Sequence, residues 1–100
     1  MSSSAAQQRV AIVNPKGLHM RPATRFVKLA GSFGSEIQVL GNGKVVNGKS
    51  ILDMTSLAAE CGTSLEIQAR GPDAAEAVAA LVDLVASRFH MHDDGDGEAV

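Results

Sequence analysis

The sequence predicts one small α+β domain, built as a two-layer, open-faced β-sandwich with its sheet below and its helices above. Strand patterns and amphipathic helical patterns follow one another in the order βαββαβα across residues 9–89. Each strand pattern alternates apolar and polar side chains, so one face of the sheet should meet water. A chain of 100 residues buries only one modest core. We therefore expect a single domain between a disordered lead at 1–8 and a disordered acidic tail at 90–100.

The first strand should begin at Arg9 and end at Asn14-Pro15, because proline cannot donate to a strand ladder. A loop at 14–19 then leads into a helix over 20–30. Apolar residues recur in this helix at i, i+3, i+4 and i+7, which predicts that one face is buried. These positions are Ala23, Phe26, Val27 and Ala30.

Two further strands should form a hairpin about the turn Gly41-Asn42-Gly43. A short helix over 51–59 follows. The clearest strand pattern lies at 64–70, where apolar and polar side chains alternate strictly. Gly71-Pro72-Asp73 then turns into a final helix over 74–88. Its apolar stripe consists of Val78, Leu81, Val82, Val85 and Phe89.

The stretch Gly17-Leu18-His19-Met20-Arg21-Pro22-Ala23 places a histidine and an arginine where a strand gives way to a helix. Pro22 lacks an N–H and suits the first turn of a helix, so the helix should begin near 19–22. Gly17 leaves room beside His19 for a sharp turn and for a ligand. Unpaired N–H groups at a helix start attract an anion such as phosphate, and Arg21 adds a planar fork of donors.

The charge around His19 suits nucleophilic chemistry. A helix N-terminus and Arg21 should both favour the neutral imidazole, whose ring nitrogen is a nucleophile. A phosphorylated His19 would then lie against donors already arranged for its negative charge. The stretch therefore predicts a phosphoryl-transfer site at His19 and Arg21. The alternative is that His19 merely caps a helix and that Arg21 is a solvated charge.

This heptapeptide resembles the active-site motif of the histidine-containing phosphocarrier proteins (HPr) of the phosphoenolpyruvate-dependent phosphotransferase system. The resemblance covers about residues 9–89. It continues through Asn47-Gly48-Lys49-Ser50-Ile51-Leu52, Gly62-Thr63 and Gly71-Pro72-Asp73-Ala74. It implies a four-stranded antiparallel sheet, in which the last strand lies between the first and the second.

The same resemblance implies a function. The protein would accept a phosphoryl group from phosphorylated enzyme I on Nδ1 of His19 and pass it to a IIA-type protein or domain. Arg21 and the N–H groups of the helix start would stabilise the phosphoryl oxygens, at a site formed with Gly17, Met20 and Pro22. Such a protein is a relay component without a cofactor rather than a turnover enzyme.

Ser50 is the second position of interest, because a regulatory kinase phosphorylates the matching serine in some members of the family. A phosphorylase would then remove the group. Ser50 and Asp53 also match a capping box, which by itself explains a serine there. Asp53 would repel a phosphate on Ser50. Capping and regulatory phosphorylation both stay open.

The family pattern places the counterparts of Met20 and Leu52 on the surface presented to partners, although core burial is the competing interpretation of each. Basic side chains gather around the candidate site and on the helix that follows it, a pattern that suits an acidic partner. They are Lys16, Arg21, Arg25, Lys28 and Lys49. With three phenylalanines, no tyrosine and no tryptophan, the chain is a poor candidate for binding nucleic acid.

Several classes of protein are disfavoured. No apolar run reaches membrane-spanning length and residues 1–8 lack the features of a secretory signal, so we expect a cytoplasmic protein without membrane insertion. Cys61 is the single cysteine, which excludes an internal disulfide and a thiolate zinc cluster. His90 and His92 lie among scattered acids that lack the order of a calcium-binding loop. We expect no metal, no cofactor and a monomer.

Two other functions stay open. A carrier of a nitrogen-related regulatory branch would use the same chemistry without feeding a sugar permease. Asp53 and the acidic tail slightly favour this alternative. A non-transferring adaptor would use only the surface of the fold. The presence of His19 argues against an adaptor, which would not need a nucleophile.

Overall fold

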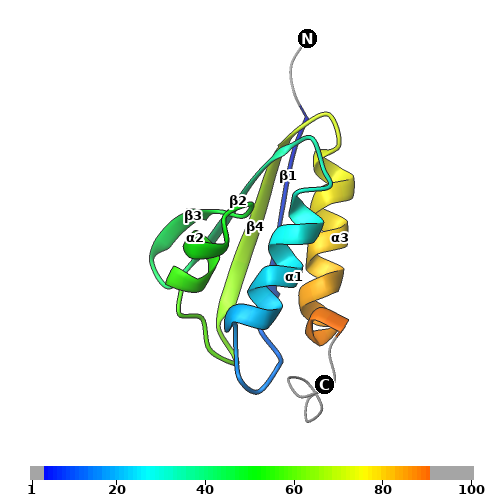
Figure 1. Cartoon of the computed structure of the whole chain (residues 1–100). Helices are drawn as coiled ribbons and strands as arrows, with labels where there is room; N and C mark the ends of the chain where they lie inside the picture. Colours follow the sequence, from blue (N-terminus) through cyan, green and yellow to red (C-terminus); the bar gives the residue numbers. More distant parts are fainter. Residues whose placement is uncertain (1–3, 91–100) are drawn as a thin grey trace.

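A computed structural model describes residues 4–90, which form a four-stranded sheet with helices packed on one face (Figure 1). The sheet order is β1-β4-β2-β3, and every neighbouring pair is antiparallel. The α+β sandwich and the central position of the last strand are therefore confirmed. The elements are β1 (Ser4–Ala11), α1 (Met20–Ala30), β2 (Glu36–Gly41), β3 (Lys44–Asn47), α2 (Ile51–Ser56), β4 (Ser64–Gly71), α3 (Ala74–Ala86) and a 3-10 turn, η1 (Arg88–His90).

β1 is longer than the sequence predicted, since it begins at Ser4 rather than at Arg9. It pairs with β4 from Ser4 opposite Gly71 to Ala11 opposite Ser64. Backbone hydrogen bonds hold the additional residues, while their side chains are mostly exposed, so no apolar alternation marked them. A disordered lead is therefore wrong for residues 4–8. Residues 1–3 lie outside the described chain, as does nearly all of the predicted tail.

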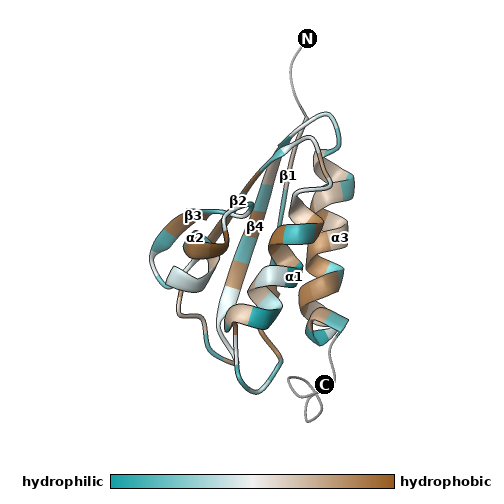
Figure 2. Ribbon diagram, in the orientation of Figure 1, coloured by the Kyte–Doolittle hydropathy of each residue, from teal (hydrophilic) through white to brown (hydrophobic). Residues whose placement is uncertain are grey.

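The core lies between the sheet and the helices. Figure 2 shows the predicted alternation along β4, where every second residue is apolar. They belong to one buried cluster with the apolar residues of α1 and α3. Burial of a Leu or Ile side chain contributes about 1.5–3 kcal/mol to folding. The largest fully buried side chains include Phe26, Phe89, Ile12, Met54, Leu57, Leu65, Ile67 and Leu81.

α2 ends at Ser56, before the predicted limit of residue 59. The hairpin that precedes it supplies the reason. Asn42, at a φ of 49° in the tight turn between β2 and β3, donates from Nδ2 to the Leu57 carbonyl at 2.9 Å. Lys44 Nζ donates to the Ser56 carbonyl at 2.9 Å. The last carbonyls of α2 thus have partners outside the helix, and Ala58 turns the chain at a φ of 51°.

α3 ends at Ala86, although the periodicity predicted a helix to residue 88. Arg88, Phe89 and His90 have φ values of 61°, 60° and 57°, so the chain leaves the right-handed helix here. This turn places Phe89 in the core, fully buried. Burial of the aromatic ring offsets the cost of the left-handed backbone.

Asp73 joins two segments that are far apart in the sequence. Its carboxylate accepts hydrogen bonds from the backbone N–H groups of Gly34 and Ser35, each at 2.9 Å, and from the Ser35 hydroxyl. The Ser35 hydroxyl oxygen in turn accepts from the Asp73 N–H at 3.2 Å. The hydrogen bonds from Ser35 and Gly34 lower the pKa of Asp73 from its ordinary value of 3.8. This cluster fixes the start of β2 against the start of α3.

Asp73→Asn is expected to destabilise the fold at neutral pH and to reduce the dependence of its stability on acid. Because the pKa is lower in the folded than in the unfolded chain, the carboxylate stabilises the fold fully above pH 3.8, and this contribution is lost as the pH falls through the folded-state pKa. Urea unfolding between neutral pH and about pH 2 measures this slope. Asp83→Asn, which alters an exposed carboxylate of α3, should keep the parental slope. A parental slope in Asp73→Asn would contradict the assignment.

Candidate functional site

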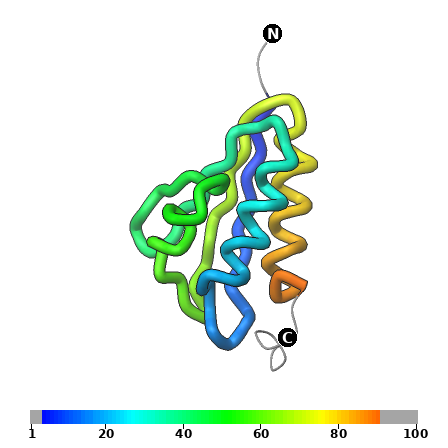
Figure 3. The backbone as a smooth tube through the Cα atoms, in the orientation of Figure 1, coloured from blue at the N-terminus to red at the C-terminus, as the bar shows by residue number. Residues whose placement is uncertain are grey.

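A tight turn at residues 14–17 positions the histidine. The Gly17 N–H donates to the Asn14 carbonyl at 3.0 Å, and the Asn14 side-chain amide donates back to the Gly17 carbonyl. The next amide, that of Leu18, donates to the Ala59 carbonyl at 2.8 Å. Figure 3 shows this loop beside the segment that joins α2 to β4. Hydrogen bonds within the turn and to the α2–β4 segment therefore fix the backbone just before His19.

Gly17 is required by its backbone and by its surroundings. Its φ is +70°, a conformation that side-chain-bearing residues rarely adopt. A Cβ at this position would lie 2.6 Å from the Ala59 carbonyl oxygen and 2.8 Å from Glu60 Cα. Both neighbours are backbone atoms, which cannot move aside as a flexible side chain can.

His19 occupies the N-cap position of α1, directly before its first residue, Met20. Its carbonyl accepts from the Ala23 N–H at 3.1 Å, while its half-buried side chain makes no capping hydrogen bond to the helix. The imidazole is therefore not a helix cap, and the first helical amides are those of Met20 and Arg21. Pro22 is buried in the first turn, where its missing N–H costs nothing. The predicted helix start is confirmed.

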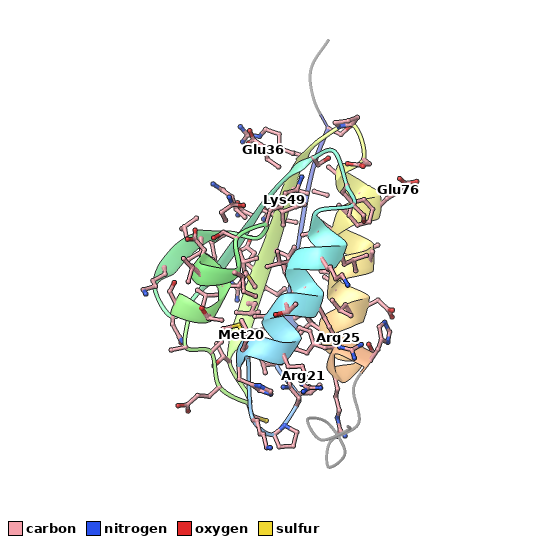
Figure 4. All side chains as sticks on the ribbon, in the orientation of Figure 1. Met20, Arg21, Arg25, Glu36, Lys49 and Glu76 are labelled. Carbon is pink, nitrogen blue, oxygen red and sulfur yellow. The ribbon has the colours of Figure 1, made fainter. Side chains whose placement is uncertain are left out.

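The chain brings most of the predicted basic residues together. His19, Arg21, Arg25 and Lys28 line an open groove that runs along α1 and reaches Leu84 of α3. Figure 4 shows Arg21 and Arg25 near the N-terminal end of α1. Their guanidinium groups suit oxygen-rich anions, and the groove is open to solvent rather than enclosed.

Lys49 lies elsewhere, which corrects its assignment to the basic cluster. Its Nζ donates to the Phe33 carbonyl at 2.8 Å, beyond the C-terminal end of α1, and Figure 4 shows it away from Arg21. Lys16 is exposed on the loop before His19. Met20 and Leu52 are 59% and 76% exposed, so core burial is excluded for both.

Ser50 caps α2, but the predicted reciprocal bond is only half formed. The Ser50 hydroxyl accepts from the Asp53 N–H at 3.3 Å. The Asp53 carboxylate accepts from the Asn47 N–H at 3.0 Å rather than from the N–H of Ser50, which donates to the Asn47 carbonyl. Asp53 therefore closes the loop between β3 and α2. A capping box would need the Ser50 N–H, but that group donates to the Asn47 carbonyl in the turn before α2.

The sequence analysis gave two residues near the site no role in it. Asn14 is buried, and its Oδ1 has no hydrogen-bond partner within the described part of the chain. His90 lines the same groove as His19, and its Nδ1 lies 3.0 Å from the Ser87 hydroxyl. An Asn before Pro was a signal for a structured turn. No local signal connected His90 to residues on α1.

Every helix within residues 4–90 is too short or too polar to span a bilayer. The same residues contain no group of three or more His, Cys, Asp or Glu side chains that could hold a metal ion. Cys61 is an exposed, free thiol on the loop between α2 and β4.

Fold and site together define a small α+β protein with a histidine at a helix start beside a basic groove, the arrangement of a histidine phosphocarrier. The chain matches the family model described as "PTS HPr component phosphorylation site" over residues 6–87. It therefore belongs to the HPr family of phosphocarriers of the phosphotransferase system.

Individual relatives agree with this assignment. The phosphocarrier protein HPr of Neisseria meningitidis serogroup B is 42% identical over 92 residues, which are 92% of this chain and 98% of the relative. The crystal structure of HPr-C-His from Thermoanaerobacter tengcongensis superposes with a TM-score of 0.82 at 41% identity, covering 87% of this chain and 98% of that one. A structure described as an HPr dimer from the same organism has a TM-score of 0.68 at 45% identity, covering 80% and 92%.

Proposed function

We propose that this chain accepts a phosphoryl group from phosphorylated enzyme I on His19 and passes it to a IIA protein or domain. The observation that carries the proposal is the imidazole at the start of α1, which makes no capping bond and borders an open basic groove. A ring nitrogen in that place is available to a partner's phosphoryl group. Membership of the HPr family supports the same chemistry.

In the proposed transfer, the lone pair of Nδ1 attacks phosphorus while the bond between phosphorus and the donor atom breaks, and that electron pair stays on the donor. The phosphoryl oxygens then lie near the first amides of α1 and the Arg21 guanidinium, which offset their negative charge. An acceptor nitrogen of the IIA partner then attacks phosphorus, the bond from phosphorus to Nδ1 breaks, and its electron pair returns to His19. The chain needs no cofactor for this exchange, because each partner supplies the other half of the site.

The surface around His19 suits acidic partners with an apolar centre. Met20, next to His19 in the chain, and Leu52, on the neighbouring helix α2, are exposed, while Lys16, Arg25 and Lys28 supply positive charge. Large apolar side chains surrounded by charge are typical of protein-binding surfaces. We propose that enzyme I and the IIA partner use this surface in turn, and that the protein acts in the cytoplasm without binding nucleic acid.

The test has two stages. Incubation with phosphoenolpyruvate and a purified enzyme I should give a single acid-labile phosphoryl adduct by intact-mass spectrometry. Addition of candidate acceptors should then discharge it. Discharge to a sugar-specific IIA domain supports sugar uptake, and discharge to a nitrogen-branch IIA protein supports the regulatory alternative. No adduct with several enzymes I, on folded protein, would overturn the carrier proposal in favour of an adaptor.

We expect the carrier to be a monomer. Two similar solved structures are described as dimers, so the expectation needs a direct measurement. Light scattering across a range of concentrations should give the mass of one chain. A dimer mass that persists on dilution would overturn it.

Ser50 is proposed as a helix cap rather than as a regulatory phosphorylation site. Ser50→Ala should lower the free energy of unfolding by about 1 kcal/mol, because the first turn of α2 loses its acceptor. Ser56→Ala is the matched control, since its hydroxyl bonds only to the Asp53 carbonyl within the same helix. Urea unfolding measures both. Stoichiometric phosphate on Ser50 after incubation with ATP and a regulatory serine kinase would overturn the proposal.

A further inference from the structure

The groove beside His19 is rich in positive charge. Ten described residues line it, and none is acidic. Arg21, Arg25 and Lys28 enter it from α1, and His90 enters it from the end of the described chain. Hydroxyl groups come from Thr24 and Ser32, and Leu29 adds an apolar side chain to the lining. Such a groove suits an acidic, extended polypeptide.

The chain itself contains a segment of that chemistry. Residues 91–100 continue directly from His90, and four of them are acidic: Asp93, Asp94, Asp96 and Glu98. This segment has no basic side chain apart from His92. The family match ends at residue 87, so this acidic stretch lies beyond the part of the chain that defines the family.

The acidic segment is long enough to span the groove. The eight residues at 91–98 would span about 26 Å if extended, whereas α1, with its 11 residues, is about 16 Å long. A segment that starts at His90 can therefore reach every basic side chain of the groove. His90 already lies in the groove, so no long loop has to close first.

We propose that the acidic segment 91–100 binds along this groove and competes with partner proteins for the basic face of α1. The inference rests on the proposed function, because the groove includes His19. Its effect is to lower the rate at which an acidic partner surface reaches the imidazole. The bound segment acts as a built-in electrostatic competitor that salt weakens.

Tethering makes this weak contact effective. Each exposed ion pair contributes little, and a free acidic peptide would bind poorly. Attachment at His90 raises the local concentration of the segment to the millimolar range. A folded partner offers a larger surface and can displace the segment. Binding therefore slows encounter without blocking transfer.

The direct test needs no phosphoryl transfer. A spin label on Ala99→Cys in the full chain, with Cys61→Ser to remove the native thiol, leaves all four tail acids in place. The label should reduce the amide NMR signals of Arg21, Arg25 and Lys28 about twofold or more at low ionic strength, with recovery at about 1 M salt. Signals of the β2–β3 turn at Asn42 should not change. Equal, slight loss of signal across the whole domain would overturn the proposal.

Charge variants separate the alternatives. Neutralisation of all four tail acids, by Asp→Asn at 93, 94 and 96 and Glu98→Gln, should abolish the signal loss at low salt. A matched pair compares Asp93→Asn/Asp94→Asn with Glu36→Gln/Glu76→Gln, which removes the same charge at the far end of the molecule (Figure 4). The second variant should behave as the parent. Signal loss that increases with protein concentration would show a second copy in the groove and overturn the intramolecular proposal.

A kinetic measurement addresses the consequence. The neutral-tail variant should be phosphorylated by phosphorylated enzyme I about threefold faster than the parent at low ionic strength, and at the same rate at about 0.5 M salt. Equal rates at low salt would overturn the competition. Failure of every enzyme I to phosphorylate either protein would instead reject the proposed function, while the spin-label result would still decide whether the segment binds.

Discussion

His19→Ala is expected to abolish phosphorylation of the chain while leaving it folded. The imidazole supplies the nucleophile, and an alanine methyl group cannot replace it. Its side chain is only half-buried and makes no capping bond to α1, so the free energy of unfolding should change by less than about 1 kcal/mol. Intact-mass spectrometry after incubation with phosphoenolpyruvate and enzyme I measures the first effect, and urea unfolding the second.

The other two histidines make this experiment specific. The chain has three, and His90 and His92 lie close together near its C-terminus. Peptide mapping of the parental adduct at neutral pH should place the phosphoryl group on His19 alone. An acid-labile adduct of parental yield in His19→Ala, or a map that places the group on His90 or His92, would reject the assignment.

Gly17→Ala should have the second large effect, because it combines two penalties at one position. An alanine at a φ of +70° costs about 1–2 kcal/mol. Its Cβ would also lie 2.6 Å from the Ala59 carbonyl oxygen, so the loop or its neighbour must move. We expect a total loss of about 3 kcal/mol or more in the free energy of unfolding.

The same substitution should slow phosphoryl transfer in the molecules that remain folded. His19 lies two residues after Gly17, and a shift of about 1 Å in a reacting group can cost a hundredfold in rate. We expect the rate of phosphorylation by phosphorylated enzyme I to fall about tenfold or more. Rapid mixing at a temperature where circular dichroism shows folded protein measures it.

Gly43→Ala provides the matched control. Its φ of +77° is close to that of Gly17, but a Cβ there meets no atom within 4 Å. It should therefore show only the backbone penalty, about 1–2 kcal/mol, with normal phosphoryl transfer. The difference between the two variants measures the close approach of Gly17 to the α2–β4 segment. Equal losses of stability and normal transfer in both would show that this contact is unimportant.

The sequence by itself determined the features that depend on near neighbours along the chain. Alternation marked β4, and the Asn42-Gly43 pair marked the β2–β3 turn, since each is a local preference of the backbone and its side chains. Pro22 marked the start of α1 because a missing N–H is tolerated only there. The placement of His19 and Arg21 at one helix start could be predicted from their spacing in the sequence alone.

Only the tertiary structure decided the features that depend on contacts between distant residues. The start of β1 follows from pairing with β4, and the end of α2 follows from the Asn42 side chain. The need for glycine at 17 arises from Ala59. His90 lies in the same groove as His19 because η1 packs near α1. These contacts join residues far apart in sequence, and no local preference encodes them because the energy that selects them exists only once the chain has folded.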